Sequence, residues 1–280
     1  MNRSYSFDQA ASYYDQVYGY PAGVEAQAVA AIRAAFALTA DERVLEVGVG
    51  SGRLAVPLQV AGYRYHGQDI AGAFMHLIAV KLPSPPAPPT GEGRIGVLLT
   101  QSDLSALPYQ TASFAGALAV QVFHLIPDLA PAIAELQRVL RPDAPLLVVN
   151  DGQPDNVDMR GRLTNALSYF LAAEGYVSDE RQPAPDKVEA AFVAAGATVE
   201  TLRPFAWSLT VSPRAFAARL AERQTSKLWH VPEPIFSRAL RRFYNWLAAD
   251  YKGRLDEPFE NPRRFVIKRI IFHSKQERIG

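Results

Sequence analysis

Three closely spaced glycines directly after a short apolar run constrain the fold of this chain more than any other feature of its sequence. Residues 44–47 have the composition of a buried strand, and Gly48, Gly50 and Gly52 occupy the first, third and fifth positions of the turn that follows. Glycine lets the backbone turn sharply and come close to a ligand, because it has no Cβ atom to collide. The helix expected over 53–61 would present unpaired N–H groups to that ligand. The pattern therefore predicts a strand, a ligand-binding loop and a helix at the start of an α/β sheet.

Short apolar segments and helical segments alternate along the rest of the first half. Helices are predicted between the strands, which is typical of a parallel sheet with helices on both faces. One of these helices begins with Asp128 as its N-cap and ends before Pro142. The further predicted strands cover residues 63–68, 95–99, 114–120 and 146–149.

The second half of the chain lacks this regular alternation. Its pattern predicts a helix over 186–196, a strand over 198–207, helical segments from Ser212 to about Tyr251, and a strand over 264–273. A strand, a helical insertion and a second strand indicate a β-hairpin at the edge of the sheet that is interrupted by a lid.

The composition narrows the classes of protein to which this chain can belong. With 280 residues, of which 49% are hydrophobic and 20% charged, the chain is long enough for a sizeable core in one or two domains. A net charge of +1 gives no overall field that would attract nucleic acid or an acidic membrane. The absence of cysteine excludes disulfides and fits a reducing compartment. The N-terminus lacks the apolar core of a secretion signal, and the longest apolar stretch, residues 114–127, is too short to span a bilayer, so we expect a soluble, cytoplasmic protein.

The spacing of the loop separates three families of nucleotide-binding loops. A Walker A loop requires a lysine after its last glycine, where this chain has Arg53, and the dinucleotide fingerprint requires a glycine at that same sixth position. Here an acidic residue, Glu46, stands two residues before the first glycine. Asp69 lies 21 residues beyond Gly48, at the end of the next predicted strand, where a carboxylate can accept both hydroxyls of a ribose. The loop resembles that of class I S-adenosylmethionine (SAM)-dependent methyltransferases.

Four further segments resemble the same family, in the same order along the chain. They are residues 7–18 (FDQAASYYDQVY), 101–109 (QSDLSALPY), 113–118 (SFAGAL) and 136–146 (LQRVLRPDAPL). Ala115 replaces an Asp that is common in the family, and Asp143 and Ala144 replace two glycines. The resemblance covers about residues 5–150.

The resemblance implies a fold. Members of this class have a doubly wound, Rossmann-like α/β sheet of seven strands in the order 3-2-1-4-5-7-6, with strand 7 antiparallel. We expect a single domain of this kind over residues 1–280, with N-terminal residues and helical insertions that cover the active site as lids. The expected lid segments are about residues 1–25, 153–182 and 208–260.

The resemblance also implies a cofactor and its binding residues. The cofactor would be S-adenosyl-L-methionine, converted to the product S-adenosyl-L-homocysteine, and the other partner would be a small-molecule acceptor. By position in the family motifs, the methionine end of the cofactor would be framed by Glu46, Gly48, Val49, Gly50 and Gly52, and its ribose would be held by Asp69. The adenine ring would be flanked by Ile70 and Met75, and its edge would be recognised by Asp103 and Leu104. Gln121 would lie beneath the sulfonium.

The reaction itself needs few special groups. Methyl transfer from a sulfonium is an in-line displacement with a good leaving group, so the enzyme mainly aligns the acceptor and excludes water. An oxygen or nitrogen acceptor of high pKa would also need a base. His124, just past the fourth strand, is our candidate, and the alternative is a half-buried histidine bonded to a backbone carbonyl. Asp151 either binds the acceptor or caps a loop, and Tyr14 and Tyr18 either form a flap over the cofactor or pack as part of a helix.

A catalytic metal is not expected. Catechol-type methyltransferases hold a metal with Asp and Asn residues near these strand ends. The position after the fourth strand carries Gln121 and Val122 instead, so the set of ligands is incomplete.

Other functions are compatible with the sequence. A protein that binds SAM without transferring the methyl group would have the same loop, and an NAD(P)-dependent oxidoreductase would have a related sheet. The basic clusters at 238–242 and 263–269 favour a solvated face over a nucleic-acid site. The acceptor, the methylated atom (O, N, C or S) and the oligomeric state, with a homodimer as one option, are left open.

Overall fold

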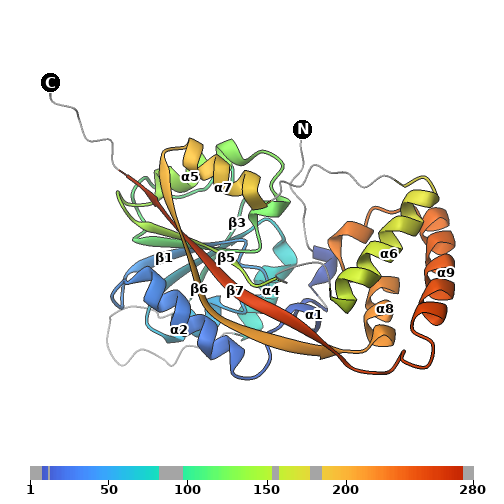
Figure 1. Cartoon of the computed structure of the whole chain (residues 1–280). Coiled ribbons are helices and arrows are strands. Elements are labelled where there is room, and N and C mark those ends of the chain that lie inside the picture. Colours follow the sequence, from blue (N-terminus) through green and yellow to red (C-terminus); the bar gives the residue numbers. More distant parts are fainter. Residues whose placement is uncertain (1–7, 12, 82–96, 153–157, 177–184, 274–280) are drawn as a thin grey trace. The chain divides into compact units, whose positions relative to one another are not determined.

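The seven strands that the structure describes belong to one sheet, in the order β3-β2-β1-β4-β5-β7-β6 (Figure 1). The structure is a computed structural model that describes residues 8–11, 13–81, 97–152, 158–176 and 185–273. The chain divides into two compact units. Unit 1 comprises residues 1–151, 181–205 and 265–280, and unit 2 comprises residues 152–180 and 206–264.

The first five strands run parallel through unit 1. They are β1 (Arg43–Val47), β2 (Arg64–Asp69), β3 (Leu98–Gln101), β4 (Gly116–Val120) and β5 (Pro145–Asn150). β1 lies between β2 and β4, with Leu45 opposite both His66 and Ala117. Helices cover both faces, so β1 and β4 are buried along almost their whole length. The carboxyl ends of these strands meet at one edge of the sheet, which brings the loops after them together.

Two long strands complete the sheet. β7 (Phe259–Phe272) runs antiparallel to β5, with Asn150 opposite Val266, and β6 (Ala197–Val211) lies beyond it at the edge. The predicted strand order and the antiparallel seventh strand are therefore confirmed. Both strands continue beyond their predicted ends into unit 2, where much of their surface is only half-buried or exposed.

Helices cover both faces of the sheet in unit 1. α2 (Val24–Phe36) lies on one face, and α5 (Leu129–Val139) and α7 (Pro185–Ala194) lie on the other (Figure 1). Asp128 caps α5, as predicted, by accepting a hydrogen bond from the amide of Ala130 at 3.2 Å. The remaining short elements of this unit are η1 (Asp8–Ala10), α1 (Tyr14–Tyr18), α3 (Ala55–Val60), α4 (Gly72–Lys81) and η2 (Phe123–Leu125).

α3 begins two residues later than the sequence pattern predicted. Arg53 and Leu54 still belong to the turn after the glycines, and the helix starts only at Ala55. This difference leaves the Arg53 side chain at the end of the turn rather than on the helix surface.

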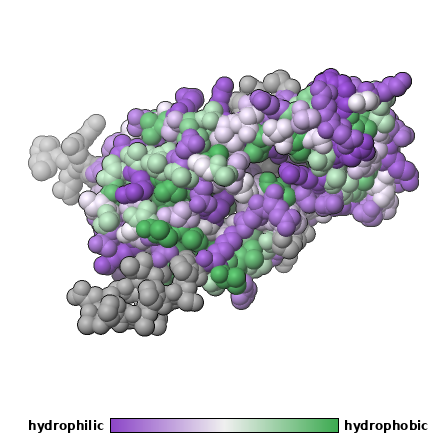
Figure 2. Space-filling view, turned by 90° about the horizontal axis from the view of Figure 1, so that it is seen from below, coloured by the Kyte–Doolittle hydropathy of each residue, from purple (hydrophilic) through white to green (hydrophobic). Residues whose placement is uncertain are grey.

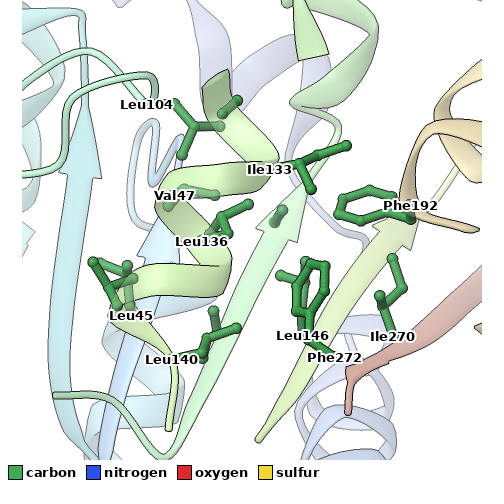
Figure 3. Packing of buried hydrophobic residues seen from close by; sticks show 14 of the residues in the cluster. Leu45, Val47, Leu104, Ile133, Leu136, Leu140, Leu146, Phe192, Ile270 and Phe272 are labelled. Atoms are coloured by element: carbon green, nitrogen blue, oxygen red, sulfur yellow. The ribbon is translucent and has the colours of Figure 1, made fainter. Parts of the chain in front are cut away.

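A hydrophobic core lies between one face of the sheet and the helices α5 and α7 that cover it (Figure 3). Leu45 and Leu146 of the sheet and Leu136 of α5 are fully buried in it. The rings of Phe192 on α7 and Phe272 on β7 belong to the same cluster, with centroids 6.1 Å apart. Tight packing of this kind fixes the strand ends that carry the candidate site.

Unit 2 has a core of its own. Its helices are α6 (Met159–Ala173), α8 (Pro213–Ala221) and α9 (Glu233–Asp250), with a short turn η3 (Ser226–Leu228). Asp158 and Ser212 cap α6 and α8 through their side-chain oxygens. The buried residues of this core include Leu163, Leu167, Phe216, Phe236, Phe243 and Leu247. The role of residues 1–25, 153–182 and 208–260 as lids stays a prediction, and parts of these segments (1–7, 12, 153–157 and 177–182) lie outside the described residues.

In the described part of the chain, no helix is long and apolar enough to cross a membrane. Figure 2 shows hydrophilic and hydrophobic residues interspersed over one face, with the most hydrophobic residues in separate groups. Much of the apolar content of the chain is gathered in the two cores instead.

Candidate functional site

The turn after β1 has an open side at its central glycine. Gly48, Gly50 and Gly52 have φ angles of 65°, 53° and 75°, a region that other residues rarely adopt. A Cβ atom on Gly48 would lie 2.3 Å from Cγ2 of Val122, and one on Gly52 would lie 2.8 Å from Cγ1 of Ile78, so packing excludes side chains at both positions. At Gly50 the one described atom within 4 Å of such a Cβ is the carbonyl oxygen of Gly48, at 3.9 Å. That position has room for a ligand.

Asp69 lies against this turn from the end of β2. Its Oδ2 accepts a hydrogen bond from the amide of Gly50, and its Oδ1 accepts one from the amide of Ala71, both at 2.8 Å. The amide of Val49 donates to the carbonyl oxygen of Gln68 at 2.9 Å, so two bonds join the turn to β2. Burial raises the pKa of Asp69, and the backbone amides offset part of that effect. Each carboxylate oxygen has a second lone pair, which can accept a hydroxyl group.

Glu46 is enclosed within the sheet and is only 3% exposed. Its Oε2 accepts a hydrogen bond from the hydroxyl of Tyr65 at 2.7 Å. Burial raises the pKa of Glu46 to about 8, although the Tyr65 hydroxyl and the charge of Arg53 lower it. This pKa favours the protonated, neutral form of the Glu46 side chain at neutral pH.

The loop after β3 lies next to Asp69. The amide of Ser102 donates to the Asp69 carbonyl oxygen at 3.0 Å, and the Ser102 hydroxyl is buried without a hydrogen-bond partner among the described residues. Asp103 Oδ1 accepts hydrogen bonds from the amide and the hydroxyl of Ser105, at 2.8 and 2.7 Å. The side chain of Leu104 packs in the core, which leaves its backbone as the part that can meet a ligand.

Ile70 and Met75 are both half-buried where the chain leaves β2 and enters α4. The carbonyl oxygen of Ile70 accepts a hydrogen bond from Gln101 Nε2 at 3.1 Å, which joins this segment to the end of β3. The residues expected at a ribose and an adenine thus follow two neighbouring strands, β2 and β3.

The N-terminal segment contacts the glycine turn and α4. Asp15 accepts a hydrogen bond from Ser51 Oγ within the turn. The ring of Tyr14 on α1 contacts the rings of Tyr18 and Phe74, with centroids 4.8 and 5.1 Å away. Tyr14 and Tyr18, predicted either as a flap or as helix packing, therefore lie on a short helix that packs against α4.

A buried ion pair joins the end of the turn to the end of β5. Arg53 Nη1 lies 2.8 Å from Asp151 Oδ2 and donates to the carbonyl oxygen of Tyr18 at 2.8 Å. The Arg53 guanidinium also lies 4.6 Å from the centroid of the Tyr20 ring, and Gln121 Nε2 donates to Asp151 Oδ1 at 2.9 Å. Burial would raise the pKa of Asp151, but the charge of Arg53 and the hydrogen bond from Gln121 outweigh it and hold this pKa below its usual value.

Asp151 and Gln121 are among the site residues predicted from the sequence, whereas Arg53 and Tyr20 are not. Asp151 is not an isolated carboxylate, because it is bonded to both Arg53 and Gln121. The one signal that could have indicated Arg53 was its position directly after the third glycine, where a long cationic side chain can reach the neighbouring strand ends.

His124 lies on η2, four residues past the end of β4, and is half-buried. Its neighbour Phe123 packs against Phe192 of the core, with ring centroids 5.1 Å apart, which fixes this short turn. Within the residues that the structure describes, no group of three or more His, Asp or Glu side chains could hold a metal. The expected lack of a catalytic metal stays a prediction.

A comparison with models of protein families matches residues 45–148 to a methyltransferase domain. The matched stretch begins in β1 and ends in β5, so it contains the glycine turn, Asp69 and the end of β4. The matched stretch and the strand order of the sheet support a class I S-adenosylmethionine-dependent methyltransferase domain.

Several solved structures resemble this chain in fold. The YcgJ protein of Bacillus subtilis is 16% identical, with a TM-score of 0.56, and the match covers 89% of this chain and 99% of that one. Phosphoethanolamine N-methyltransferase 2 of Haemonchus contortus, solved with phosphomonomethylethanolamine and S-adenosylhomocysteine, is 14% identical, with a TM-score of 0.53, and the match covers 96% of this chain and 58% of that one. The [4+2]-cyclase SpnF is 17% identical, with a TM-score of 0.50, over 88% of this chain and 80% of that one.

The residues of the matched stretch fit S-adenosylmethionine at three described points. Gly50 is open on the side where a side chain would stand, which suits the close approach of a ligand. Asp69 is held beside it with lone pairs to spare, and the buried Ser102 hydroxyl next to Asp69 still lacks a partner among the described residues.

Proposed function

We propose that this protein transfers a methyl group from S-adenosyl-L-methionine to a small-molecule acceptor and releases S-adenosyl-L-homocysteine. The observation that carries the proposal is the pair formed by Gly50, which is open on its outer side, and Asp69, whose carboxylate is held beside it by the Gly50 amide. Both residues lie in the methyltransferase domain.

In this proposal the side chains bind and orient rather than form covalent bonds. Bound S-adenosylmethionine supplies an electrophilic methyl group. Asp69 accepts the ribose hydroxyls, the glycine turn frames the methionine end, and the loop after β3 with Ile70 and Met75 holds the adenine. Gln121, which follows β4, would lie next to the sulfonium. Alignment and exclusion of water then provide most of the rate enhancement, because the leaving group is already a good one.

One neighbour bears on the acceptor, and another bears on the reaction itself. The neighbour from Haemonchus contortus was solved with phosphomonomethylethanolamine, which is a small molecule, and this favours a small-molecule acceptor here. The cyclase SpnF has the same fold but is named for another reaction, so the fold alone does not establish methyl transfer. A protein that binds S-adenosylmethionine without using it is therefore the second candidate.

Calorimetric titration of the purified protein with three ligands tests the proposal. We expect S-adenosylmethionine and S-adenosylhomocysteine to bind with micromolar affinity and NADH not to bind. Binding of NADH alone would overturn the proposal in favour of an oxidoreductase. Binding of the first two justifies a screen of acceptors, and the transfer of a radiolabelled methyl group to one of them separates an enzyme from a binding protein.

Replacement of Asp69 by alanine should weaken the binding of S-adenosylmethionine by about 1–3 kcal/mol, the usual contribution of hydrogen bonds to a charged group. This corresponds to a roughly 5- to 150-fold increase in Kd, measured by the same titration. Asp186→Ala, on the exposed first turn of α7, is the matched control and should leave Kd unchanged. An unchanged Kd for Asp69→Ala would show that the ribose assignment is wrong.

His124 is proposed as the general base for an acceptor that must lose a proton. Once an acceptor is found, His124→Ala should lower kcat by about 100-fold or more, the usual contribution of a general base, while the Kd for S-adenosylmethionine stays the same. The measurement is a turnover assay beside a binding titration of the same variant. Equal turnover would assign His124 to packing.

A further inference from the structure

The ion pair between Arg53 and Asp151 connects four parts of unit 1. Arg53 ends the glycine turn, and its Nη1 reaches both the Tyr18 carbonyl of the N-terminal segment and the Asp151 carboxylate after β5. Asp151 in turn accepts a hydrogen bond from Gln121, which follows β4. The side chains of the pair are only 14% and 10% exposed. A pair of charges this far from water has to be held in good geometry, since each partner left alone would be strongly destabilising.

These contacts determine the orientation of the side-chain amide of Gln121. Nε2 of Gln121 donates to Asn150 Oδ1 and to Asp151 Oδ1, both at 2.9 Å. Both partners are acceptors, so the nitrogen and not the oxygen has to face them. The amide oxygen Oε1 is therefore turned away from Asn150 and Asp151. The neighbouring residue Val122 lies directly against Gly48, so the backbone that carries Gln121 passes close to the start of the glycine turn.

We propose that Arg53 is a positioning residue for methyl transfer: through Asp151 it fixes the Gln121 amide so that the amide oxygen faces the sulfonium of the bound cofactor. The negative end of the amide dipole would stabilise the positive sulfonium and restrict the methyl group to one direction. The inference rests on the proposed function, because it needs S-adenosylmethionine in this site. It adds a role for two residues, Arg53 and Asp151, that do not have to touch the cofactor.

A purely structural role for the pair predicts a different result from a positioning role. If the pair only stabilises the fold, then a double variant that removes both charges should behave like the wild type once its stability is recovered. If the pair orients Gln121, then the same double variant folds well but still loses the orientation of the amide. The double variant therefore distinguishes a structural role of the pair from a positioning role.

Thermal unfolding of three variants provides the first measurement. Arg53→Met and Asp151→Leu should each lower Tm by about 5–10 °C, because each leaves an unpaired buried charge. The double variant Arg53→Met/Asp151→Leu should recover most of this loss, since apolar side chains of similar size can replace a buried pair. Arg141→Met, which breaks the more exposed pair of Arg141 with Glu42 in the same unit, is the control and should shift Tm little.

The second measurement is the NMR resonance of S-adenosylmethionine labelled with ¹³C at its methyl group, recorded at saturation. An amide oxygen beside the sulfonium should shift the methyl resonance of the bound cofactor from its position in free solution. In the double variant, and in the isosteric Asp151→Asn, we expect at least about half of this shift to be lost while Kd changes by less than about threefold, because the amide can then turn. Arg141→Met should retain the full shift.

Three outcomes would overturn the inference. A methyl resonance that stays at its wild-type position in the double variant would reduce the pair to a structural role. A Kd increased by about 100-fold or more in the stability-recovered double variant would show that Arg53 binds the cofactor directly rather than through Gln121. Failure of the wild type to bind S-adenosylmethionine would overturn the proposed function itself, and it is recognised before any variant is made.

Discussion

Replacement of Gly48 by alanine is expected to lower the free energy of unfolding by about 2–5 kcal/mol. Two effects add at this position. The φ angle of 65° is unfavourable for alanine, and the new Cβ would lie 2.3 Å from Cγ2 of Val122, two residues past the end of β4. Val122 cannot move far, because it lies between β4 and η2 and packs against the core. Urea-induced unfolding, followed by circular dichroism, measures the loss.

Alanine variants of two other glycines in unit 1 distinguish the effect of backbone strain from the effect of a steric clash. Gly196 has a φ of 84° and no described atom within 4 Å of a built Cβ, so Gly196→Ala should lose only about 1–2 kcal/mol and bind S-adenosylmethionine normally. Gly50→Ala should lose a similar amount of stability but should also weaken cofactor binding, because its Cβ would enter the space left for the ligand. A Gly48→Ala variant as stable as Gly196→Ala would show that the contact with Val122 relaxes freely.

Replacement of Glu46 by glutamine is expected to remove a large pH dependence of stability. Burial raises the pKa of Glu46 from its ordinary value of 4.5 to about 8, against the opposing effects of Tyr65 and Arg53. Between these two values the unfolded chain releases the proton while the folded chain keeps it. The folded state therefore binds more protons, and the stability of the wild type falls as the pH rises from about 5 to about 8. Above that range the penalty is constant, and below it the penalty is absent.

The comparison of wild type and Glu46→Gln across pH is the measurement. Glutamine can still accept the Tyr65 hydrogen bond and has no proton to lose, so the two proteins should be similar in stability near pH 5. At pH 8 the variant should be more stable by several kcal/mol, since each unit of pKa shift corresponds to about 1.4 kcal/mol. His66, whose pKa burial and the nearby Arg43 lower to about 4, titrates in both proteins and cancels in the difference. A difference that does not change with pH would show that Glu46 is ionised in the folded protein.

Much of the fold could be predicted because its signals are local. The glycine turn, Asp69 and the four family-like segments each mark the end or start of an element, and the expected order of the strands follows from the family that they resemble. Boundaries were less predictable where the deciding contacts are remote. Phe114 was expected to open β4, but it pairs with Leu140 in an isolated bridge, and the strand starts at Gly116.

In the candidate site, too, the residues marked by local sequence patterns could be predicted, and the contacts between distant residues could not. Gly50 and Asp69 could be predicted because a turn and a strand end are visible in the local sequence. The pair of Arg53 with Asp151 could not, because the two residues are 98 positions apart and meet only after β1, β4 and β5 have been placed side by side. The same holds for the burial of Glu46, which depends on Tyr65 of the neighbouring strand.

The position of β7 also affects the growing chain on the ribosome. β7 is the last strand along the sequence, yet it lies between β5 and β6. The nascent chain therefore exposes the edge of β5, from Pro145 to Asn150, until residues 266–271 have emerged to pair with it. All of unit 2 is synthesised during that interval. An open apolar strand edge pairs readily with other chains, so a chain that is truncated before β7 should accumulate as aggregates, and slow translation of the second half should increase its need for chaperones.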